Sequence, residues 1–73
     1  MKRSALRAQL DKIETRIAKT IGDIADLRVR ISELAEYGLG TVEARLALAI
    51  SERSLKQEIE ERDKLVAELE ALS

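Results

Sequence analysis

The chain has 73 residues, neither cysteine nor histidine, and a formal net charge of −1. This composition excludes disulfides and the common zinc sites. A chain this short usually needs an additional source of stability, and we therefore expect self-association to supply it. The near-neutral charge gives no general attraction to nucleic acid or anionic membranes. The longest apolar run, residues 46–50, is far too short to span a bilayer. We expect a cytoplasmic protein without cofactor or metal.

The first predicted element is a helix over about residues 4–37. Its apolar residues recur in steps of four and three, the spacing of a coiled-coil-like seam, at Leu6, Leu10, Ile13, Ile17, Ile24, Leu27, Ile31 and Leu34. Thr20 takes the one polar position in this seam. Gly22 falls on the outer face and weakens the helix. We expect one continuous helix, with a break at Gly22 as the alternative.

A turn is predicted at residues 38–41, within the sequence YGLGT. Gly38 suits the left-handed position that ends a helix, and Leu39 can fold back on the last turn. Gly40 follows, and Thr41 is the expected N-cap of the next helix. A phosphate-binding loop would need a preceding strand and a fuller glycine motif, and the sequence has neither.

The second predicted helix covers about residues 42–72. Its seam consists of Ala44, Leu48, Leu55, Ile59, Val66 and Leu69, flanked by Leu65 and Leu72. The two seams match when the chain is folded at the turn, and a short connection favours antiparallel packing. The predicted fold is therefore all-α: residues 1–73 form a single antiparallel, coiled-coil-like two-helix hairpin.

Several apolar residues lie outside these seams and form the predicted oligomer interface: Ile21, Ala25, Val42, Leu46, Ala49 and Ile50. A two-helix hairpin buries one stripe per helix, and a remaining apolar patch usually marks an association site. A symmetric dimer that forms a four-helix bundle is the simplest closure. A higher oligomer or a different protein partner is the alternative.

The basic residues near the N-terminus form a predicted stripe: Lys2, Arg3, Arg7, Lys12, Arg16 and Lys19. The antiparallel fold brings Lys12, Arg16 and Lys19 opposite Glu58, Glu61 and Glu68, so internal pairing is one interpretation. A nucleic-acid contact is the other, although the stripe has no aromatic side chain to stack on bases. Arg62 lies on the seam and is expected to direct its charge outwards, towards Glu58 or another carboxylate.

Catalysis is not expected, because the sequence contains no recognisable site constellation and a two-helix hairpin has no deep cleft. The predicted function is a non-enzymatic protein–protein interaction module: a small adaptor, chaperone-like protein or accessory subunit acting as a homo-oligomeric bundle. The alternative is a small nucleic-acid-binding regulator that uses the basic stripe.

Overall fold

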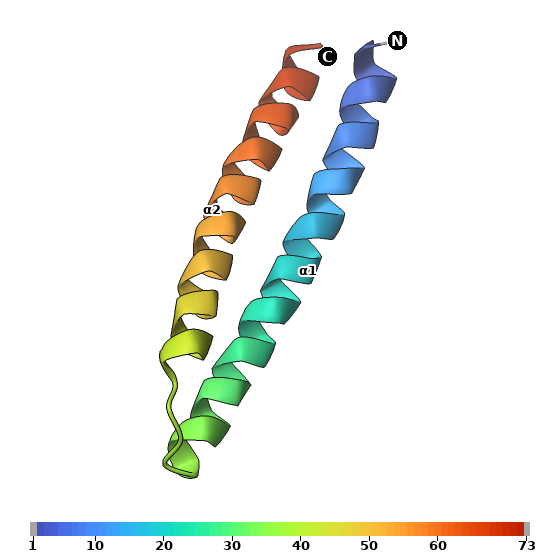
Figure 1. The fold of residues 1–73 in the computed structure, drawn as a ribbon. Coiled ribbons are helices and arrows are strands. Elements are labelled where there is room, and N and C mark those ends of the chain that lie inside the picture. Colours follow the sequence, from blue (N-terminus) through green and yellow to red (C-terminus); the bar gives the residue numbers. More distant parts are fainter. Residues whose placement is uncertain (1, 73) are drawn as a thin grey trace.

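The protein is a rod of two helices that pack against each other along their length. The computed structural model describes residues 2–72, which form α1 (Lys2–Glu36) and α2 (Val42–Ala71) and contain no strand. The helices run antiparallel, with both ends of the chain at one end of the rod and the turn at the other (Figure 1). The rod measures 55 × 14 × 13 Å between its outermost Cα atoms. The all-helical, two-helix prediction is confirmed, and α1 continues through Gly22 without a break.

The contact between the helices follows the predicted seams. Leu6, Ile13, Ile17 and Ile24 of α1 are buried, and the other α1 seam residues, Thr20 included, are half-buried. All six seam residues of α2 are half-buried as well. Steps of three and four residues keep these side chains on one face of each helix, which is why a single stripe from each forms the core. Leu72, expected at the seam's edge, is exposed instead.

The end of α1 is a Schellman motif built on Gly38. The Leu39 N–H donates to the Leu34 carbonyl at 2.8 Å, and the Gly38 N–H donates to the Ala35 carbonyl at 3.1 Å. Gly38 has a φ of 69°, a conformation that glycine adopts without the steric cost of a Cβ. Leu39 remains 58% exposed, so it folds back on the last turn far less than expected.

Thr41 stands at the N-cap of α2, but it does not cap the helix with its side chain. Its φ of −115° and ψ of 3° lie outside the extended region from which a cap hydroxyl reaches the first free amides. The hydroxyl oxygen instead accepts a hydrogen bond from Arg45 Nε at 2.8 Å. The expected side-chain cap is therefore replaced by a contact with the next turn of the helix.

Candidate interaction surfaces

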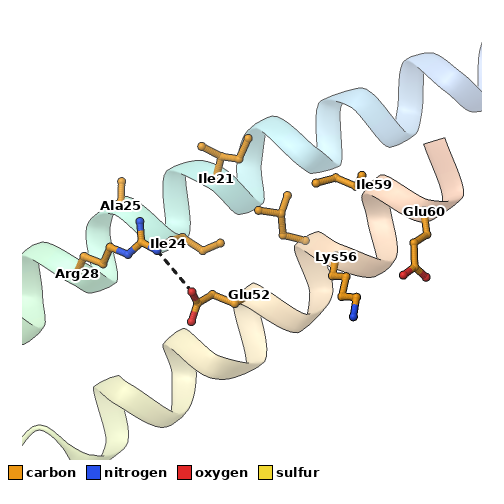
Figure 2. Close-up of a pocket in the computed structure, with 9 residues that line it drawn as sticks. Ile21, Ile24, Ala25, Arg28, Glu52, Lys56, Ile59 and Glu60 are labelled. Atoms are coloured by element: carbon orange, nitrogen blue, oxygen red, sulfur yellow. Dashed lines mark hydrogen bonds and ion pairs between the residues drawn. The ribbon is translucent and has the colours of Figure 1, made fainter. Parts of the chain in front are cut away.

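A shallow groove of about 510 Å³ runs between the two helices near the middle of the rod. We call it the interhelical groove, and its lining is Ile21, Ile24, Ala25, Arg28, Glu52, Leu55, Lys56, Ile59 and Glu60. In Figure 2, Ile24 and Ile59 lie between the ribbons, whereas the side chains of Lys56 and Glu60 point away from α1. Arg28 Nη2 and Glu52 Oε2 form an ion pair at 3.4 Å that joins the two helices. The groove thus has an apolar floor and a charged rim.

The six residues of the predicted interface do not all lie at this groove. Ile21 and Ala25 line it, but Val42, Leu46, Ala49 and Ile50 do not. At 100° per residue, Val42 and Ala49 point within about 70° of the groove side of α2, Leu46 about 110° away and Ile50 about 150° away. The structure therefore separates the predicted interface into a groove side and the outer surface of α2.

We call the second surface the outer patch, and it consists of Val42, Leu46 and Ile50. These residues follow one another at intervals of four along the first turns of α2, and each is more than half exposed. Val42, which is 78% exposed, forms the edge of the patch nearest the groove side.

Other exposed apolar residues near the turn were not part of the predicted interface. Val29 is 58% exposed on the side of α1 opposite its seam, and Tyr37 and Leu39 are exposed in the turn. A list of apolar residues off the seam would have found Val29, because its phase differs from the seam by about half a turn. These residues extend the apolar surface around the turn end of the rod.

The predicted basic stripe also occupies two different sides of the hairpin. Arg3 and Arg7 line a hollow with Val66 and Glu70. Lys12 and Arg16 line another with Glu61. Arg7 lies two heptads before Ile21 and is therefore on the same side of α1 as the interhelical groove. Lys12 and Arg16 line a different hollow, which contains neither Arg3 nor Arg7.

The ion pairs expected between Lys12, Arg16 or Lys19 and the carboxylates of α2 do not form. Within residues 2–72, Arg7, Lys12 and Arg16 make no ion pair, and Lys19 pairs with Asp23 of its own helix at 3.5 Å. Long exposed side chains gain little from being held in one geometry, so proximity to Glu61 alone does not create a bridge.

Glu58 is the buried charged residue of α2, and only 9% of its surface is exposed. Its Oε1 atom is buried without a hydrogen-bond partner. Arg62, the expected partner, donates instead to Asp63 Oδ1 from Nη2 at 3.0 Å and from Nε at 3.2 Å. An unpaired buried carboxylate oxygen destabilises the fold at this level of the hairpin.

The part of the chain that the structure describes has no cluster of three or more metal-ligating side chains. Neither helix there is long and apolar enough to cross a bilayer.

Comparisons with family models, with curated proteins and with solved structures found no match to this chain.

Proposed function

We propose that this chain is a non-enzymatic protein–protein interaction module that pairs with a second copy to form a four-helix bundle. The observation that carries the proposal is the exposed apolar surface of residues 21–50, which covers part of both helices and the turn. Exposed apolar side chains that gather in one part of a small protein are typical of an association site.

The size of the hairpin supports the same proposal. Two helices in a single layer give each helix only one buried stripe, and just four hydrophobic side chains among residues 2–72 are buried. A chain this short buries a small fraction of its surface, and association is a common source of the missing stability. A closed symmetric dimer hides the same patch on both copies.

The work of such a dimer would be to hold another protein, as a small adaptor, chaperone-like protein or accessory subunit does. The groove side and the outer patch lie on different sides of α2, so self-association through one leaves the other accessible. This arrangement supports a module with two docking surfaces, one for its own copy and one for a different protein.

The oligomeric state in solution tests the proposal. Multi-angle light scattering and sedimentation velocity should report at least a dimer at micromolar concentration. Two double variants then locate the interface: Ile21→Glu with Ala25→Glu on the groove side, and Leu46→Glu with Ile50→Glu on the outer patch.

We expect at least one of these double variants to dissociate the oligomer, because a buried unpaired carboxylate strongly opposes association. Ala5→Glu with Ala8→Glu is the matched control, since both positions are exposed on α1 and face away from its groove side. The wild type should be measured up to about 100 µM, a concentration above the dissociation constant of a weak dimer. A stable, helical monomer at that concentration would contradict the proposal.

A nucleic-acid-binding regulator is the second candidate, and the unpaired state of Arg7, Lys12 and Arg16 favours it. Glu61 and Glu70 share the hollows of these basic residues and oppose the approach of phosphate. A mobility-shift assay in low salt with a random duplex and a single-stranded oligonucleotide tests it. A shift that Lys12→Glu with Arg16→Glu abolishes would support this second function.

A further inference from the structure

α2 carries a second regular stripe on the side of the interhelical groove, and this stripe shares only Ile59 and Val66 with the seam. Its eight positions alternate in steps of three and four residues from Val42 to Val66, which keeps them on one face of the helix. Three central members, Glu52, Lys56 and Ile59, line the groove. The structure therefore presents this groove-side stripe along most of α2.

The order of residue types in the stripe makes it complementary to a second, antiparallel copy of itself. Its first half reads apolar, basic, apolar, acidic in Val42, Arg45, Ala49 and Glu52.

Its second half reads basic, apolar, acidic, apolar in Lys56, Ile59, Asp63 and Val66. When an identical helix is laid antiparallel with the midpoint at residue 54, apolar positions meet apolar positions and each charge meets its opposite. Self-complementarity under reversal is the property that a two-fold symmetric interface requires.

We infer that a second copy docks antiparallel on this groove side, with the two-fold axis at the level of residue 54. This inference rests on the dimer proposed above and adds the face, direction and register of its interface. Arg45 then pairs with Asp63 of the second copy, and Glu52 with Lys56 of the second copy. Symmetry repeats both ion pairs, and Val42 packs against Val66.

The monomer leaves these charged groups accessible. Arg45 donates a hydrogen bond to Thr41 through Nε alone, so its Nη atoms are not used in that contact. Asp63 is paired with Arg62 yet keeps 63% of its side chain exposed, and Glu52 keeps 51% exposed beside Arg28. Each therefore can take a further partner from the second copy.

The same register brings small residues together on α1. The Arg28–Glu52 ion pair places residue 54 of α2 level with residues 25 and 26 of α1. Ala25 lines the groove, so it faces Ala25 of the second copy across the axis. A methyl group on each side lets the two α1 helices approach closely.

A shifted register can oppose the pairing. Moving the axis by two residues, to residue 56, sets Lys56 against Lys56 and Glu52 against Glu60 of the second copy. Like charges directly opposite each other disfavour an interface, so the charge order favours the axis at residue 54 over the axis at residue 56.

A single-cysteine cross-linking experiment tests the register, and the chain has no native cysteine to interfere. Ala25→Cys should form a disulfide-linked dimer under mild oxidation, because the axis brings its two copies within bonding distance. Ala18→Cys is the matched control on the same face of α1. Its two copies would stand roughly 21 Å apart along the helices, so it should cross-link far more slowly.

A charge exchange tests the pairing independently. Arg45→Asp and Asp63→Arg should each weaken dimerisation about tenfold, because two attractive contacts become repulsive. The double variant should recover most of the affinity. The two residues stand about 27 Å apart on one helix, so recovery has to come from contact between copies.

The outcomes separate the two proposals. Dimerisation with selective Ala25→Cys cross-linking and recovery in the charge exchange supports the inference. A dimer in which Ala25→Cys and Ala18→Cys cross-link equally, or in which Leu46→Glu with Ile50→Glu alone dissociates the copies, overturns the register and leaves the interaction module intact. A monomeric wild type overturns both.

Discussion

The two halves of the rod differ in how completely they bury their apolar side chains. We call residues 2–20 with 59–72 the terminal half, and residues 21–58 the turn half. Three of the four buried hydrophobic side chains, Leu6, Ile13 and Ile17, belong to the terminal half. Within residues 2–72, every large apolar side chain that is more than half exposed belongs to the turn half. The terminal half buries its apolar residues within one chain, whereas the turn half leaves surface that a further chain is needed to cover.

Sequence pattern explains this contrast. In the terminal half, apolar residues are largely confined to the seam and charged residues occupy the outside. In the turn half, Ile21, Val29, Leu46 and Ile50 lie off the seam, and the half-buried Ala44 and Ala47 are small. The difference teaches that a single heptad pattern does not fix how complete a core is. The apolar residues outside the pattern determine whether one hairpin can bury all of its apolar surface without a second chain.

The largest expected effect comes from the core of the terminal half. Ile13 is 3% exposed, so Ile13→Ala should lower the free energy of unfolding by about 2–4 kcal/mol through lost burial and a cavity. Val29→Ala in the turn half is the control and should change it by less than about 0.5 kcal/mol. Urea denaturation followed by circular dichroism at one protein concentration measures both. Equal losses would remove the distinction between the halves.

The next effect concerns the carboxylate at the boundary of the halves. Glu58→Leu should raise the free energy of unfolding by about 1–3 kcal/mol, because it replaces an unpaired buried oxygen with apolar surface. Glu61→Leu, at an exposed position of the same helix, controls for helix propensity and should change little. The same urea titrations measure these variants. A loss of stability in Glu58→Leu would show that the carboxylate has a partner in solution, such as an ordered water.

Periodicity predicted most of the fold because it reports directly which face of a helix is covered. The seam residues, the turn at Gly38 and the pairing of two helices all followed from spacing and from terminator residues. The candidate surfaces were predicted less completely. Whether Ile21 and Ile50 share a side depends on the rotation of each helix in the hairpin. Whether Arg62 pairs with Glu58 or Asp63 depends on rotamers, which a pattern of residue types does not encode.

The glycines give a smaller effect, with opposite signs in two places. Gly38→Ala in the turn should cost about 1 kcal/mol of unfolding free energy, because a Cβ is disfavoured at a φ of 69°. Gly22→Ala should instead add about 0.5–1 kcal/mol, since Gly22 is helical and no atom within 4 Å obstructs a Cβ. Thermal unfolding followed by circular dichroism compares them. A stabilising Gly38→Ala would mean that the turn does not hold the Schellman conformation.

The smallest effect belongs to the ion pair that joins the helices within the turn half. Arg28 and Glu52 are more than half exposed, so Arg28→Ala should change the free energy of unfolding by less than about 0.5 kcal/mol. Salt should reduce even this difference, because exposed charges are screened. Urea titrations at low and high salt measure it, with Arg30→Ala of the same helix as control. A loss of several kcal/mol that persists in salt would mean that a second chain buries this pair. The turn half would then obtain, between copies, the enclosure that the terminal half has within one.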